Sequence, residues 1–421
     1  MFNRGLSLDQ APPFAVVLRF FLTIPLFGIL ASLAVLGADT STLWLWEAPE
    51  TVAVVHLVVL GIAGMAMVGS LFQMLPVIAG ASIRDPLYHA RWIHAFMAFG
   101  TLTLSGGFYF ALEGMFHTAL LPLLGALGFV VFLMFSKLLK VENKTPSVVG
   151  MIAAVAALGF GLFFALLAML AFMGVDLGFS LPVLRTVHMH FMLLGWIGML
   201  IMAVAFQVIE MFYVTPPYPE VVRKWFPLAI LGILALQVPF YLVSPAVVTA
   251  LDFVVGALFL VFAIVTLKRL AQRKRPVADT TVWLWRTGLA SLAASVLLAL
   301  FSIAVGGETP FVFAALLFGY FVLSIIFAMS YKIVPFLVWF HLNAKGVLEC
   351  PMMGDVIPAA RMRPHLWLHW ALGISFLVAS FVPPLWKAAG AIFLIESILY
   401  GINLVGAARI YYQLKDKGIL S

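Results

Sequence analysis

Twelve runs of apolar residues, each twenty residues or longer, constrain the fold of this chain more than any other feature of its sequence. A helix needs about 20 apolar residues to cross a bilayer, and spanning segments must pair every backbone group. We therefore expect an all-α polytopic membrane protein with about twelve transmembrane helices. The runs cover residues 14–37, 52–80, 92–112, 115–136, 148–174, 184–214, 225–244, 246–267, 284–305, 310–340, 366–386 and 388–410.

The composition excludes a chain that folds in water. Hydrophobic residues make up 64% of the 421 residues and charged residues only 10%, with a mean hydropathy of +1.14. A soluble domain has about 25% charged residues. The single cysteine, Cys350, excludes an intrachain disulfide and any site with several cysteine ligands. We expect one membrane domain, residues 1–421, embedded in a lipid bilayer.

The loops between the runs alternate in charge, which predicts the topology. The positive-inside rule places the basic loops and both termini in the cytoplasm, as in a bacterial inner-membrane protein. The net charge of +7 is then a topology signal and not a nucleic-acid-binding surface. The first run is too long for a signal peptide, so we expect it to remain as a span. The cytoplasmic set comprises Arg4, Arg84, Arg91, Lys137, Lys140, Lys144, Arg223, Lys224, Lys268, Arg269, Arg273, Lys274, Arg275, Lys345, Arg361, Arg363, Arg409, Lys415 and Lys417; the outer set comprises Arg185, Lys387, Asp39, Glu47, Glu50, Glu113, Asp176 and Glu308.

An internal repeat divides the chain. His56 begins the string H-L-V-V-L-G and His190 begins H-F-M-L-L-G, 134 residues later. A Phe-Gln pair follows each histidine, with the phenylalanine 16 and the glutamine 17 residues later, which makes Gln73 and Gln207 equivalent. A third copy, beginning at Tyr331, carries Ala315 at the histidine position. Trp92, Trp225 and Trp367 each open the next run. We expect three pseudo-equivalent units of four helices, at approximately 14–146, 147–281 and 282–421, related by an axis along the membrane normal.

Three histidines, His56, His188 and His190, are expected near the outer ends of their helices, at similar depth in the membrane. Ionisable groups there mark functional sites by default, although a histidine can also join helices through a hydrogen bond. His188 and His190 point to nearly opposite faces, because two residues turn a helix by about 200°. His56 and His190 occupy equivalent positions, so we expect them to ligate one bis-imidazole haem. Arg185 either pairs with a haem propionate or reaches the interface as a helix-end arginine.

A second polar group is expected toward the cytoplasmic side. Gln73, Gln207 and Lys332 are equivalent by the repeat, and Glu210 replaces a proline of the other copies. A Lys332–Glu210 pair with the two amides could relay protons, bind an anion or join the units structurally. Five further histidines are expected at interfacial helix ends, and His94 and His369 are equivalent by the repeat. The five are His89, His94, His341, His365 and His369.

These motifs resemble subunit I of the haem–copper oxidase superfamily. Thr186-Val187-His188-Met189-His190, followed by Leu194-Gly195-Trp196, is similar to the H-x-H helix of C-type oxidases, and the strings around His56 and His190 also resemble the NnrS family. The resemblance implies a low-spin haem b between His56 and His190, and a second haem on His188. It implies electron transfer, handling of a diatomic gas such as NO or O2, or both.

The chain departs from the oxidase pattern in ways that bear on its chemistry. The H-x-H helix belongs to the second unit instead of the third, no His-His pair is present, and His117 lies near the outer surface. We expect no copper and no standard oxygen reduction, and an oxidoreductase activity stays open. A quinol or a periplasmic cytochrome could donate electrons, and a homo-oligomer is equally open. The alternative function is a repeat-built transporter with a His/Lys/Glu pathway.

Overall fold

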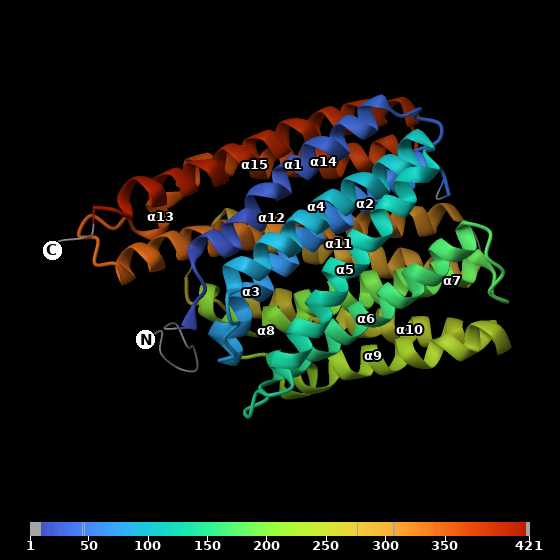
Figure 1. Ribbon diagram of the computed structural model, residues 1–421, viewed down its shortest axis with the longest axis horizontal. Helices are drawn as coiled ribbons and strands as arrows, with labels where there is room; N and C mark the ends of the chain where they lie inside the picture. The colour runs from blue at the N-terminus through green and yellow to red at the C-terminus, as the bar shows by residue number, and fades with distance from the viewer. Residues whose placement is uncertain (1–9, 44, 46, 276, 306–307, 418–421) are drawn as a thin grey trace.

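The chain folds into long helices that run side by side, joined by short loops (Figure 1). The computed structural model describes residues 10–43, 45, 47–275, 277–305 and 308–417, without the side chains of 308–311. Arg4 and the side chain of Glu308 therefore lie outside the described residues. No strand occurs within the described ranges. In the part of the chain that the structure describes, ten helices are long and apolar enough to cross a membrane, which confirms an all-α polytopic fold.

Each long helix corresponds to an apolar run of the sequence. Proline opens several of them, at Pro49, Pro86, Pro146 and Pro245, where its missing amide proton costs no helical hydrogen bond. The elements are α1 Phe14–Gly37, α2 Pro49–His56, η2 Leu57–Gly64, α3 Met65–Ala79, α4 Pro86–Phe110, α5 Glu113–Leu138, α6 Pro146–Phe172, α7 Leu181–Met189, η3 His190–Gly198, α8 Met199–Tyr213, α9 Glu220–Val243, α10 Pro245–Ala271, α11 Thr280–Val305, α12 Glu308–Ala344, α13 Met353–Val356, α14 Ala359–Ala379, η4 Pro383–Leu385 and α15 Trp386–Leu414.

Two further long helices run beside the ten spans but are less apolar than these. They are α4, with 25 residues, and α14, with 21. Each carries the Trp-x-His motif near its start, and α14 also carries Arg361, Arg363 and His365 in its first two turns. These polar residues lower the mean hydropathy of the helix without shortening it.

Two π-helical segments begin at or directly after the repeat histidines. In η2 the first residue follows His56, and in η3 the first residue is His190. Both segments end on the equivalent glycines Gly64 and Gly198, 134 residues apart. π-Helical turns are rare in proteins, and those that occur often lie at functional sites. The sequence repeat is therefore matched by a repeated backbone irregularity beside its histidines.

The first and last helices close the bundle into a ring. Along the chain, α5 packs against α6 and α10 against α11, and α15 then packs against α1. Lys387, near the start of α15, donates hydrogen bonds from Nζ to the carbonyls of Leu36 and Ala38 at 2.6 and 2.5 Å. Carbonyls at a helix C-terminus otherwise lack partners, so this ammonium group satisfies the end of α1.

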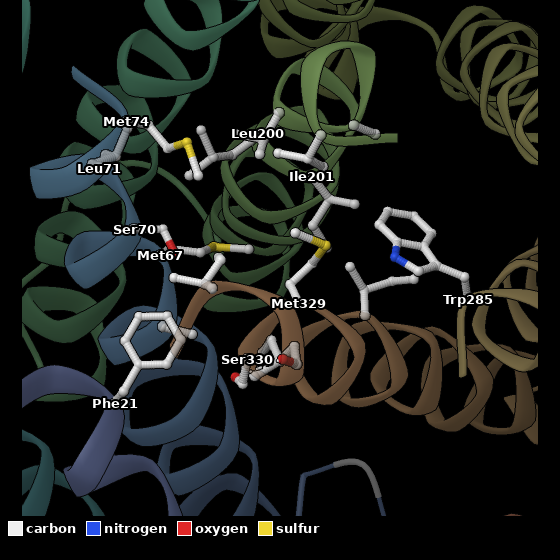
Figure 2. A pocket seen from close by; sticks show the side chains of 17 residues that line it. Phe21, Met67, Ser70, Leu71, Met74, Leu200, Ile201, Trp285, Met329 and Ser330 are labelled. Carbon is white, nitrogen blue, oxygen red and sulfur yellow. Dashed lines mark hydrogen bonds between the residues drawn. The ribbon is translucent and has the colours of Figure 1, made fainter. Parts of the chain in front are cut away.

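A small cavity of about 70 Å³ lies where α3, α8 and α12 meet (Figure 2). Each of these helices contributes five residues at the same spacing. The three sets are offset by 134 and 259 residues, and 259 also separates Phe72 from Tyr331 in the sequence repeat. The lining of the cavity thus follows the repeat register. It consists of Ala66, Met67, Ser70, Leu71, Met74, Leu200, Ile201, Val204, Ala205, Val208, Ile325, Ile326, Met329, Ser330 and Ile333, with Phe21 and Trp285.

Candidate functional site

His56 and His188 have the same ring-nitrogen arrangement. His56 Nδ1 lies 2.8 Å from the carbonyl of Val52, and His188 Nδ1 lies 3.0 Å from the carbonyl of Gly161. A carbonyl can only accept, so Nδ1 carries the proton in each ring and Nε2 holds a lone pair in the neutral form. Among the described residues, Nε2 of neither ring has a hydrogen-bond partner. Metal-ligating histidines commonly show this arrangement.

His56 of α2 and His188 of α7 are near enough for a charge on one ring to act on the other. His190 contacts α9, where its Nδ1 lies 2.9 Å from the Tyr241 hydroxyl and 3.4 Å from Gln237 Oε1. No contact between His56 and His190 is found within the described part of the chain. The shared haem between those two residues therefore stays a prediction.

His56 and His190 have equivalent aromatic surroundings on different helices. The ring of His56 stacks on Phe108 of α4, with centroids 5.8 Å apart, and the ring of His190 packs against Tyr241 of α9 at 6.2 Å. Phe108 and Tyr241 are 133 residues apart, as are Trp92 and Trp225, so the two environments are equivalent. The turn of about 200° between His188 and His190 leaves His188 on the face toward His56.

Polar residues around His190 form a cluster that sequence reasoning missed. Gln237 donates from Nε2 to Asp252 Oδ1 at 2.6 Å, and that oxygen lies 3.9 Å from His190 Nδ1. Gln237 is buried, and the side chains of His190 and Asp252 are 17% and 20% exposed. An Asp and a Gln inside apolar runs were the signal that could have indicated this cluster.

Arg185 has a protein partner. Its guanidinium lies 2.7 Å from Glu47 Oε1 in the loop after α1, and the two side chains are 32% and 70% exposed. A pair this exposed contributes little stability. Arg185 could therefore exchange this carboxylate for another anion at small cost.

Of the four residues expected to form an inner cluster, Lys332 and Glu210 have partners outside it. Lys332 Nζ lies 2.6 Å from Asp279 Oδ2 and 5.4 Å from the ring centroid of Tyr213. Glu210 accepts a hydrogen bond from the Tyr218 amide at 3.1 Å. The structure therefore pairs Lys332 with Asp279 and not with Glu210. Gln73 is buried, and its amide atoms have no partner among the described residues, whereas Gln207 is half-buried.

Asp279 lies just before α11, outside the spans, and its charge is held by several donors. Burial raises the pKa of its carboxyl, but the charge of Lys332 and hydrogen bonds from Lys332, Thr281 and the Val282 amide outweigh burial. The net pKa is below the ordinary value. Asp279 is adjacent to an apolar run and not inside it, so hydropathy gave no signal for this pair.

The expectation that the cytoplasmic-side histidines sit at interfacial helix ends is wrong for two of them. His365 and His369 have no exposed surface and lie beside Glu396 of α15, which is also fully buried. The helix α14 begins at Ala359 instead of residue 366, so these histidines lie six and ten residues inside it. His94, equivalent to His369 by the repeat, contacts the Thr23 hydroxyl at 2.7 Å.

The other two cytoplasmic-side histidines contact aromatic rings. His89 lies 5.4 Å from Phe129, and His341 lies 5.9 Å from Phe14, measured between ring centroids. No group of three or more His, Cys, Asp or Glu side chains suited to a metal ion occurs among the described residues. A metal at the outer histidines would therefore depend on a group that supplies further ligands of its own.

Comparison of the chain with protein-family models and with curated protein sequences finds no match.

Proposed function

We propose that this chain is a haem b-binding membrane protein of the oxidase-like fold. It would transfer electrons, handle a diatomic gas such as NO or O2, or do both. The observation that carries the proposal is the pair His56 and His188. Each ring has Nδ1 hydrogen-bonded to a carbonyl and Nε2 without a partner among the described residues.

The donor set fits a haem. Two neutral imidazoles with fixed Nδ1 protons are the protein donors that a low-spin haem b would need. A haem bound by two histidines supplies one-electron transfer. His56 and His188 would hold it, and Arg185 would pair with its propionates in place of Glu47. His190, with its Nδ1 toward Gln237 and Tyr241, is left as the candidate ligand for a second haem.

The membrane topology is the second part of the proposal. We propose twelve spans in three four-helix units, with α4 and α14 crossing beside the ten more apolar helices and both termini in the cytoplasm. The ring of packed helices supports this arrangement, as does the cavity lined by equivalent positions of α3, α8 and α12. The alternation of basic and acidic loops supports the orientation in a bacterial inner membrane.

A transporter with a polar pathway along the axis has less support. The central cavity measures about 70 Å³, and its described lining is apolar apart from Ser70, Ser330 and the Trp285 indole nitrogen. Lys332 and Glu210 are not part of this lining and pair with Asp279 and the Tyr218 amide. An apolar cavity of that size does not suit a hydrophilic substrate.

Reduced-minus-oxidised absorption spectroscopy of the purified full-length protein tests the haem assignment. We expect a low-spin haem spectrum in the wild type that is lost in His56→Ala and in His188→Ala. His190→Ala should keep that spectrum, as should the matched control His117→Ala, whose side chain is exposed near the outer end of α5.

The two failures of the haem assignment differ from each other. Loss of the spectrum in His190→Ala, with His188→Ala unchanged, would show that the repeat register had chosen the right partner for His56. A wild-type protein that binds no haem when haem is supplied during expression would exclude the proposed function. Such a protein would favour the transporter.

A further inference from the structure

A second group of ionisable side chains is fully buried among the last helices, apart from the outer histidines. Glu396 of α15 lies between two histidines of α14. Its Oε1 is 2.8 Å from His369 Nδ1 and 3.1 Å from His365 Nε2, and none of the three residues has exposed surface. Buried ionisable groups are costly unless they are paired, and inside a membrane they indicate function by default.

The hydrogen bonds of His369 are compatible with two proton counts. His369 Nε2 lies 2.7 Å from Ser324 Oγ, which lies 2.7 Å from the Tyr320 carbonyl. When Ser324 donates to that carbonyl, its oxygen accepts from Nε2, and a second ring proton lies between Nδ1 and Glu396. When Ser324 donates to Nε2 instead, the ring carries one proton, on Nδ1. The two states differ by one proton and the rotation of one hydroxyl.

His365 flanks the same carboxylate with a fixed tautomer. Its Nδ1 lies 2.5 Å from the Tyr331 hydroxyl, which accepts a hydrogen bond from Asn403 Nδ2 at 2.9 Å. Because an ionised carboxylate can only accept, the ring proton of a neutral His365 lies on Nε2, beside Glu396, and Tyr331 donates its proton to Nδ1. The Nε2 proton is not aligned as a hydrogen bond, and Glu396 Oε2 has no partner among the described residues. The carboxylate therefore retains capacity to accept another proton or a water.

One side chain separates this group from a larger cavity. The ring of Tyr320 stacks on His369 with centroids 4.4 Å apart. Tyr320 also lines a cavity of about 450 Å³ between α11, α12 and α14, together with Trp370 and Gly373. The polar groups of its lining are Thr287, Ser291, Ser380, the Trp370 indole and the Tyr320 hydroxyl. A small movement of Tyr320 would therefore connect His369 to this cavity.

We infer that Glu396, His369 and Ser324 form a proton-binding site that holds one exchangeable proton. The inference goes beyond the proposed function, because it requires no haem. The titratable groups around Glu396 are the two histidines of α14, Tyr320 and Tyr331 of α12, and Tyr400 of its own helix. The helix α1 also packs along α15, but no charge on its described residues acts on Glu396.

Nitrogen-15 NMR of histidine-labelled full-length protein in lipid bilayers counts the ring protons directly. We expect His369 to carry two ring protons at low pH and one at high pH while the protein stays folded. Glu396→Gln should keep His369 at one ring proton throughout, because the amide donates to Nδ1 without a charge. The matched control Glu113→Gln, at an exposed position at the start of α5, should leave the titration of His369 unchanged.

Two results would overturn the inference. One is a wild-type His369 whose proton count is the same at every pH, whether one or two. The other is a Glu396→Gln protein in which His369 still becomes doubly protonated over the same range. If Glu396→Gln does not fold, the wild-type titration decides alone. Ser324→Ala then assigns the His369 signal, since this change alters the partner of His369 Nε2.

Discussion

Gly195→Ala tests the close contact between the π-helical segment η3 and α6. A methyl group on Gly195 would lie 2.6 Å from Ala157 Cβ. Carbon atoms pack at about 3.5–4.0 Å, so the two elements would have to separate by about 1 Å. Ala157 is fully buried and has no flexible side chain that could move aside. Overpacking of this kind costs about 1–3 kcal/mol.

The matched control is Gly232→Ala in α9, where an added methyl group meets nothing within 4 Å. Both changes share the gain of about 1 kcal/mol that alanine gives over glycine in a helix, so their difference isolates the packing cost. We expect Gly195→Ala to be less stable than Gly232→Ala by about 1–3 kcal/mol in detergent-induced unfolding followed by circular dichroism. Equal stability of the two variants would refute the close approach of η3 and α6.

Three further predictions follow from charge, topology and ligand chemistry. Lys332→Met should destabilise the protein at neutral pH by about 1–2 kcal/mol, and Lys332→Met with Asp279→Asn should recover most of it. Because the pKa of Asp279 is depressed, the stability from this pair is present above about pH 4 and is lost as the pH falls through the pKa of Asp279 in the folded protein. In acid, the stability of Lys332→Met in urea or detergent unfolding should therefore approach that of the wild type. A reporter fused after Ser421 should be active on the cytoplasmic side, and activity confined to the periplasm would contradict the proposed orientation. Metal analysis should find iron without stoichiometric copper, because a copper centre needs further histidine ligands; one copper per chain after chelator washing would contradict this.

The positions of the helices could be predicted from the sequence because apolar length is a direct physical requirement of the bilayer. Each predicted run contains a long helix, and the register inferred from Phe72 and Tyr331 recurs in the lining of the central cavity. The start of α14 was the main error. Polar residues such as Arg361 and Arg363 marked residues 359–365 as a loop, whereas they form the first turns of the helix.

The partners of the histidines could not be predicted in the same way. A repeat shows which residues are equivalent but not which of them face each other, so the pairing of His56 with His190 stays a prediction. Glu396 belongs to neither the repeat nor a histidine motif, and it was not predicted as a site residue. A glutamate in the middle of the apolar run 388–410 was a sufficient signal by itself.

The packing of α15 against α1 has a consequence for the order of the motifs along the chain. Helices arranged in a circle have no first member, and in a circle of three segments each segment borders both of the others. The H-x-H motif belongs to the third segment in the oxidase pattern and to the second segment here. Both of these segments border the first segment, which carries His56, although on different sides. In the proposed arrangement of three units, the place of the motif is therefore a difference in chain order and not in adjacency. Such an arrangement would let the proposed histidine ligands lie on either side of the first unit.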